Sequence, residues 1–204
     1  MKRPTTEERL RREGEPTTPR QSASLILVRD GDRGLELLLV RRSPAQRFMG
    51  GFWVFPGGAV DPGEDHRAAA VRELAEEAGV TDLAPEALVE YSRWITPELI
   101  EIRFDTRFFV ARAPARVRPR VDGEECVDLR WTTPRAALDA YARSELALVF
   151  PTLRHLEQLS AFTTVDLLLE HAREREIVAV LPRVVLGADE PRVVLPGEPG
   201  YDDE

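Results

Sequence analysis

Residues 58–80 read GAVDPGEDHRAAAVRELAEEAGV, and this stretch decides the fold. Apolar residues recur in it at the spacing of a helix that packs on one side: Ala69, Val71, Leu74, Ala75 and Ala78. Gly79 then supplies a stop, because glycine readily adopts the left-handed backbone that ends helices. The stretch therefore predicts a charged helix over residues 64–78.

Three glutamates of this helix, Glu73, Glu76 and Glu77, stand at positions i, i+3 and i+4, so their carboxylates share one helix face. A solvated acidic face is the ordinary explanation of such a triplet. Three carboxylates this close also repel one another unless a cation lies between them. Hard oxygen ligands of this kind suit Mg²⁺ or Mn²⁺, so the triplet is a candidate metal site.

Two kinds of neighbour support this candidate site. Arg72 precedes Glu73 and can hold the site's geometry through charge-assisted hydrogen bonds. Gly57 and Gly58 let the backbone turn sharply into the loop and approach a ligand closely.

Upstream of the helix, two apolar runs at residues 22–30 and 35–42 are separated by DGDRG and predict a hairpin of buried strands. A third short strand is expected at residues 53–55, followed by a proline and glycine loop. Downstream, further strands are expected within residues 86–96, 102–113 and 126–131.

Three more helices are expected towards the C-terminus. Thr133 and Pro134 provide a cap and a first-turn proline, and helices over residues 151–162 and 163–175 are separated by a second cap signal near Thr163. The remainder predicts a hairpin around residues 187–191 and an acidic tail. This order of elements indicates an α/β fold, with a mixed sheet between helical layers.

We expect a mobile arm over residues 1–21, a core over 22–132, helices of the same domain over 133–175, and the terminal hairpin and tail over 176–204. A net charge of −8 argues against general binding to nucleic acid or anionic membranes. One cysteine excludes an internal disulfide, and three scattered histidines do not suggest zinc. The polar N-terminus does not read as a signal peptide, so a cytoplasmic location is expected.

The quoted stretch resembles the Nudix box, Gx5Ex7REUxEExGU, where U is aliphatic. Every specified position is filled, by Gly58, Glu64, Arg72, Glu73, Leu74, Glu76, Glu77, Gly79 and Val80. The resemblance implies the Nudix α/β/α sandwich, with the box as a loop, helix and loop. The helices predicted over residues 133–175 would form a C-terminal helical extension. It also implies hydrolysis of a nucleoside diphosphate linked to a further group X.

The same resemblance implies roles for individual residues. Glu73, Glu76 and Glu77 would ligate the metal, Arg72 would orient Glu73, and Glu64 would brace the loop against the helix. Nudix enzymes often carry a further acidic residue, as a base or an extra ligand, ahead of a strand that bears a tryptophan. Here VDGEECVDLRW offers Glu124, Glu125 and also Asp122, and the sequence does not choose among them.

Residues 38–58, LLVRRSPAQRFMGGFWVFPGG, resemble the coenzyme A diphosphatase signature LLTxR[SA]x3Rx3Gx3FPGG, with Val40 in place of its threonine. Arg42 and Arg47 match its arginines, and both can neutralise phosphate charge because a guanidinium offers a fork of donors. Gly57 and Gly58 end the signature beside the expected ligand. The resemblance implies coenzyme A or its thioesters as substrate.

The sequence also allows other interpretations of the substrate and of the class of protein. ADP-ribose, NADH and dinucleoside polyphosphates require the same chemistry and differ only in the leaving group. A Nudix module that senses a nucleotide without turnover is a different class, although all the box carboxylates are present. A small-molecule substrate is the expected partner, and the long C-terminal helical segment is compatible with a homodimer.

Overall fold

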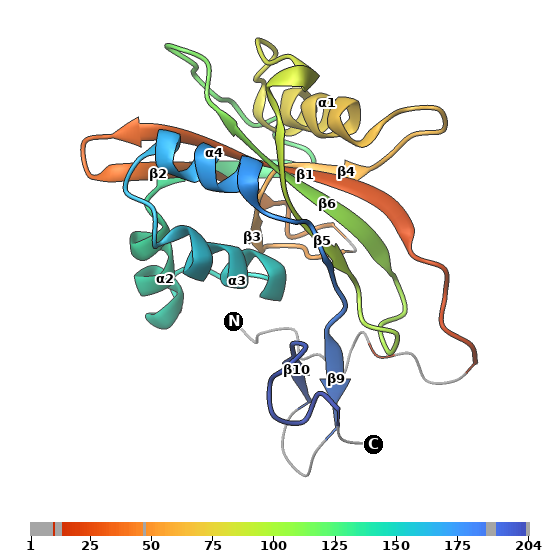
Figure 1. Ribbon diagram of the computed structural model, residues 1–204. Coiled ribbons are helices and arrows are strands. Elements are labelled where there is room, and N and C mark those ends of the chain that lie inside the picture. The colour runs from red at the N-terminus through yellow and green to blue at the C-terminus, as the bar shows by residue number, and fades with distance from the viewer. Residues whose placement is uncertain (1–9, 11–13, 47, 187–190, 203–204) are drawn as a thin grey trace.

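The computed structural model describes residues 10, 14–46, 48–186 and 191–202. The predicted hairpin is formed by β1 (Arg20–Gly31) and β2 (Gly34–Arg42), antiparallel with Val28 opposite Leu37 (Figure 1). Gly34 closes the turn with a φ of 99°, a backbone conformation that suits glycine. The DGDRG signal therefore predicted this hairpin correctly.

The side chains of β1 alternate between the two faces of the sheet, as the two-residue period of a strand requires. Ala23, Leu25 and Leu27 pack in one hydrophobic cluster, and Ile26 and Val28 in the other. All five are fully buried, so β1 is the centre of the fold.

The main sheet has the order β3-β2-β1-β6-β5-β8, and β7 also pairs with β2. Its other strands are β3 (Trp53–Val54), β4 (Gly57–Ala59), β5 (Val89–Ile95), β6 (Phe104–Arg112), β7 (Cys126–Thr132) and β8 (Ala179–Val180). β1 runs parallel to β6 and antiparallel to β2, so the sheet is mixed as predicted.

Helix α1 (His66–Ala78) covers one face of the sheet. Its residues Ala70, Leu74 and Ala78 pack in the same hydrophobic cluster as Leu25 and Leu27 of β1. The helix begins after Asp65, whose carboxylate accepts the backbone N–H groups of the first turn, and ends at Gly79 with a left-handed φ of 63°. Asp65 therefore places the start of the helix two residues after the predicted position.

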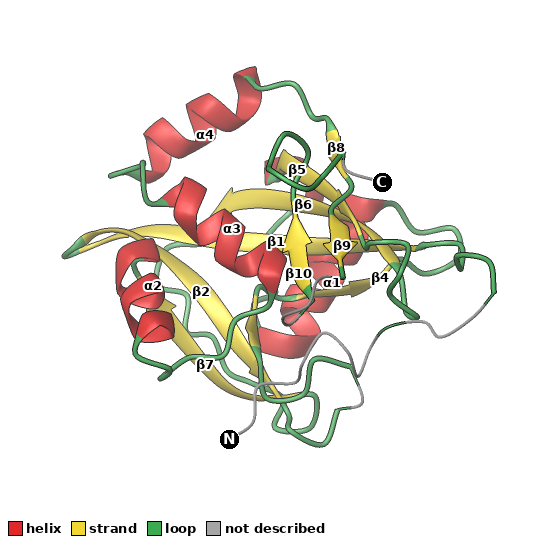
Figure 2. Ribbon diagram, turned by 90° about the horizontal axis from the view of Figure 1, so that it is seen from below, coloured by secondary structure: helices red, strands yellow, loops and turns green. Residues whose placement is uncertain are grey.

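The opposite face is covered by α2 (Pro134–Ala142), α3 (Phe150–Leu159) and α4 (Val165–Glu174), and Figure 2 shows α2 and α3 in front of the sheet. Thr133 and Thr164 cap α2 and α4 with their side chains. Helices on both faces of a mixed sheet confirm the predicted α/β/α sandwich. No helix of the described residues is long and apolar enough to span a bilayer.

Three segments differ from the expectation. β4 (Gly57–Ala59) occupies part of the predicted proline and glycine loop and pairs with β1. A 3₁₀ helix, η2 (Pro85–Ala87), takes the start of one predicted strand, and β8 was not predicted. These elements are only two or three residues long, which is too short to show a period in the sequence.

Described residues near the N-terminus contact the folded part, whereas residues 1–9 and 11–13 of the predicted arm lie outside the described residues. β1 begins at Arg20, two residues before the expected boundary, and the Thr17 hydroxyl donates to the Glu101 carbonyl at 3.0 Å. The predicted terminal hairpin is formed by β9 (Arg183–Val185) and β10 (Arg192–Val194), whereas most of its predicted turn, residues 187–190, lies outside the described part.

His155 of α3 lies fully buried against the sheet, among the rings of Phe55, Tyr91, Trp94 and Phe108. Its Nε2 lies 2.6 Å from the Ser92 hydroxyl and its Nδ1 lies 2.7 Å from the Pro151 carbonyl. Burial disfavours the charged imidazolium and lowers the pKa of His155 to about 4. The neutral ring therefore joins α3 to β5.

We predict that His155 loses its stabilising effect in mild acid. The unfolded chain binds this proton near pH 6.5 and the folded chain only near pH 4, so the contribution is present at pH 7 and falls between those values. Burial raises the pKa of Glu77, so the contribution of Glu77 to stability changes with pH in the opposite direction. The test therefore compares wild type with His155→Gln, because both proteins carry Glu77. The difference in free energy of unfolding between the two proteins, measured in urea, should fall by roughly 2–3 kcal/mol from pH 7 to 4.5. An NMR titration that places the His155 pKa near 6.5 would contradict this.

Candidate active site

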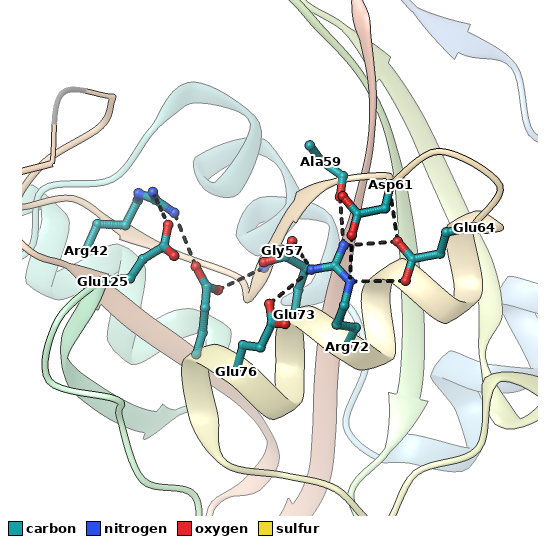
Figure 3. Close-up of polar contacts among 10 residues, drawn as sticks. Arg42, Gly57, Ala59, Asp61, Glu64, Arg72, Glu73, Glu76 and Glu125 are labelled. Carbon is teal, nitrogen blue, oxygen red and sulfur yellow. Dashed lines mark hydrogen bonds and ion pairs between the residues drawn. The ribbon is translucent and has the colours of Figure 1, made fainter.

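The guanidinium of Arg72 is the centre of the acidic site on α1. It donates to both carboxylate oxygens of Glu64 at 3.1 and 3.0 Å, to Glu73 at 2.8 Å and to Glu76 at 3.0 Å. It also donates to the Ala59 carbonyl of β4 at 2.9 Å (Figure 3). Arg72 thus ties α1 to β4 and to the loop that precedes the helix.

These contacts change the acidity of the groups involved. Hydrogen bonds to Glu64 raise the pKa of Arg72, and the hydrogen bond from Arg72 lowers the pKa of Glu64. Burial raises the pKa of Glu73, although Arg72 opposes the shift, and the nearby charges of Glu76 and Glu125 raise it further. Glu73 is therefore the least solvated carboxylate of the Arg72 group.

Glu77 lies deeper, with 1% of its side chain exposed. Its carboxylate accepts the backbone N–H of Gly57 at 3.0 Å and a guanidinium N–H of Arg42 at 3.2 Å. Burial raises its pKa to about 7, while these two donors oppose the shift. The nearby charges of Glu73 and Glu125 also raise the pKa of Glu77. The three carboxylates therefore lie near one another.

Of the acidic candidates ahead of β7, the structure brings Glu125 into the site. Its carboxylate accepts from Arg42 at 2.7 Å (Figure 3), and the same guanidinium donates to Glu77. Glu124 is exposed, and its described hydrogen bond is made by its backbone N–H to Asp122. The structure therefore separates two neighbouring glutamates that the sequence left equivalent.

The three glutamates of the predicted metal site share one face of α1 and are held by two different arginines. Arg72 holds Glu73 and Glu76, whereas Arg42 and Gly57 hold Glu77. Within the described residues, no group of three or more His, Cys, Asp or Glu side chains is arranged to hold a metal ion. In this structure the carboxylates fall into two groups, and each group is paired with its own arginine.

Gly57 and Gly58 lie in β4 and neither has a positive φ, so they do not provide the sharp turn expected from the sequence. Close approach explains both residues. A Cβ atom at Gly57 would meet the Ala23 carbonyl and Ser24 of β1, and one at Gly58 would meet the Glu73 carboxylate. Glycine therefore lets β4 lie between β1 and α1.

Arg42 was expected to bind substrate phosphate, yet in the structure its guanidinium faces protein. It is 13% exposed and contacts Glu77, Glu125 and the Phe48 carbonyl. These contacts arise because Arg42 ends β2 at a bulge in its pairing with β7. Arg47, the other predicted phosphate contact, lies outside the described residues.

Two hollows in the surface lie away from the carboxylates. One of about 540 Å³ lies beside the start of α1 and includes His66, Arg67 and Arg107. The other, about 500 Å³, lies between α3, α4 and β5 and includes Tyr91 and Phe162. Neither of these two hollows is lined by the box glutamates or by Arg42.

A mixed sheet between helical layers, with an arginine-tied acidic helix beside a glycine strand, defines the Nudix class of α/β hydrolases. The NUDIX domain family model matches residues 18–153, and the chain belongs to the Nudix hydrolase family. Members of this family act on small nucleotide substrates and generally use divalent metals such as Mg²⁺ or Mn²⁺.

Curated relatives match most of the chain. It is 26% identical to "Putative nudix hydrolase 7" of Caenorhabditis elegans, over 91% of this chain and 75% of that protein. It is 24% identical to Acyl-coenzyme A diphosphatase NUDT19 of Homo sapiens, over 91% of this chain and 81% of that one. A solved NUDIX hydrolase from Alicyclobacillus acidocaldarius is 29% identical, with a TM-score of 0.68 over 76% of this chain and 96% of its own.

We predict that Arg72→Lys destabilises the fold, because one ammonium group cannot reach the positions of Glu64, Glu73 and the Ala59 carbonyl together. The free energy of unfolding should fall by about 1–3 kcal/mol in urea titrations. The matched control is Arg112→Lys, since Arg112 pairs with Asp30 and Asp166 at an exposed position and should change stability by less than about 0.5 kcal/mol. Equal losses in the two variants would contradict the central role of Arg72.

Proposed function

We propose that this Nudix hydrolase cleaves the phosphoanhydride bond of coenzyme A or its thioesters, giving 3′,5′-ADP and 4′-phosphopantetheine or its acyl form. One observation carries the proposal: the segment that resembles the coenzyme A diphosphatase signature runs from β2 to β4 and ends against the carboxylates. Arg42, near its start, contacts Glu77, and Gly57, near its end, donates to the same carboxylate. The similarity to the human acyl-coenzyme A diphosphatase over 91% of the chain supports the choice of substrate.

A divalent cation fits the donor set. Glu73, Glu76 and Glu77 come from one face of α1, and Glu125 reaches the same place from the loop before β7. With Asp61 and Glu64, the site holds six carboxylates against the guanidinium groups of Arg42 and Arg72, so it repels an anionic diphosphate unless a cation is added. We therefore propose Mg²⁺ or Mn²⁺ as the cofactor, held by Glu73, Glu76 and Glu77.

When bound, the cation would polarise phosphoryl oxygens and lower the pKa of the attacking water. The protein's own groups orient the reaction. Arg72 fixes the Glu73 carboxylate, and Gly57 with Arg42 fixes that of Glu77. Glu125 is the acidic residue outside the box that we assign as the base or extra ligand, since its carboxylate shares Arg42 with Glu77.

Purified protein supplied with Mg²⁺ or Mn²⁺ should convert coenzyme A to 3′,5′-ADP and 4′-phosphopantetheine, identified by mass spectrometry. Water labelled with heavy oxygen should place the label on one product and so locate the attacked phosphorus. ADP-ribose, NADH and a dinucleoside polyphosphate should be assayed in parallel. If coenzyme A and its thioesters stay intact while one of these is hydrolysed, the coenzyme A proposal is wrong and the hydrolase class stands.

Glu77→Gln separates an enzyme from a nucleotide sensor. Turnover should fall on the order of 100-fold, because the neutral amide weakens a cation site, while burial favours a neutral group and the fold is retained. Steady-state kinetics and thermal unfolding measure the two effects. Glu157→Gln, at a surface pair with Arg154, is the control and should keep full activity. A wild-type protein that binds nucleotide without metal and turns nothing over would establish the sensor.

A further inference from the structure

Asp122 holds the loop that carries Glu125. Its two carboxylate oxygens accept three backbone N–H groups, from Glu124 at 3.2 Å, Glu125 at 2.7 Å and Cys126 at 2.8 Å. Gly123 makes this tight turn possible with a φ of 85°, and its N–H donates to the Cys126 carbonyl at 2.9 Å. The turn thus closes on itself immediately before β7.

The backbone of Glu125 is fixed on its other side as well. Its carbonyl accepts the N–H of Ser43 at 2.7 Å, directly after β2 ends at Arg42. The pairing between β2 and β7 shifts by one residue here, with Arg41 opposite Asp128 and Arg42 opposite Cys126. This bulge brings the Glu125 side chain over Arg42, at 2.7 Å, instead of continuing the regular ladder.

We propose that Asp122 is a positioning residue of the hydrolase, acting through Glu125 on Arg42 and, through Arg42, on Glu77. The chain of contacts is continuous: Asp122 to the Glu125 backbone, the Glu125 carboxylate to Arg42, and Arg42 to the Glu77 carboxylate. It links a loop to a helix residue that has 1% of its side chain exposed.

The contacts of Asp122 assign it this role rather than that of a base. Both of its oxygens are engaged by backbone donors, and the hydrogen bonds from Glu125, Cys126 and Glu124 outweigh the opposing effect of burial and hold its pKa below the usual range. Its contribution is therefore the geometry of Glu125. The inference rests on the proposed hydrolysis, so its test includes a measurement that needs no substrate.

The kinetic test compares Asp122→Ala, Asp122→Asn and Asp128→Asn. Asp128 is the matched control, because it lies on the same segment and accepts one backbone N–H, from Leu129, at an exposed position. Asp122→Ala should lower kcat by about 10–100-fold, as loss of a group that orients a ligand does, with KM changed less than kcat. Asp122→Asn keeps one acceptor oxygen and should recover part of the loss, and Asp128→Asn should match wild type.

A double-mutant cycle shows whether Asp122 acts through Glu125. If it does, Asp122→Ala combined with Glu125→Gln should be no slower than Glu125→Gln alone, because the second change removes the group that the first one misplaces. Losses that multiply would overturn the proposal, since Asp122 would then act by another route.

The measurement without substrate is hydrogen exchange of the Arg42 Nη2–H groups, which donate to Glu125, followed by NMR. Asp122→Ala should speed this exchange, because Glu125 no longer holds the guanidinium. A purely local role in the turn would speed exchange of the Glu125 and Cys126 amides alone, and an unchanged Arg42 signal would overturn the proposal. If wild type hydrolyses nothing while Arg42 exchange still responds to Asp122, the proposed function fails and the positioning role stands.

Discussion

Repulsion among carboxylates is the constraint on which the rest of this structure depends. Glu64, Glu73 and Glu76 gather around Arg72, and Glu77 and Glu125 gather around Arg42. Each arginine offers several N–H donors in a fixed plane, so one side chain can hold carboxylates from different elements. Without these two groups the carboxylates would lose most of their compensating charge, and burial would favour protonation of Glu73 and Glu77.

The two arginines also explain the arrangement of the backbone. Arg72 contacts the Ala59 carbonyl of β4, and Gly57 of the same strand donates to Glu77, so α1 and β4 are joined at both ends of the acidic face. Such close packing leaves no space for a Cβ atom at Gly57 or Gly58. The glycine strand and the acidic helix therefore form one structural unit, and neither can shift without the other.

Much of the fold could be predicted from the sequence because its signals are local. The DGDRG turn, the apolar spacing of α1, the stop at Gly79 and the Thr133 cap each act within a few residues, and each matches the structure. β4 has no such signal, because a strand of Gly57, Gly58 and Ala59 lacks alternating side chains. α1 starts at His66 and not at the predicted residue 64, because the Asp65 carboxylate accepts the first N–H groups of the helix.

The site was less predictable, because its partners lie far apart in the chain. Spacing on a helix showed that Glu73, Glu76 and Glu77 share a face, but not that Arg42, 35 residues before Glu77, would bind one of them. The bulge beside Arg42 and the turn at Asp122 decide between Glu124 and Glu125, and both depend on strand register.

The position of β1 at the centre of the sheet has a consequence for how the chain folds. β1 pairs in parallel with β6, and side chains 84 residues apart, such as Ser22 and Thr106, meet across that pair. Such long-range pairing slows folding, because a large loop must close before the contact is gained. During synthesis, the first hairpin and α1 would emerge well before β6, so their apolar faces would depend on chaperones or on transient collapse until the central pairing forms.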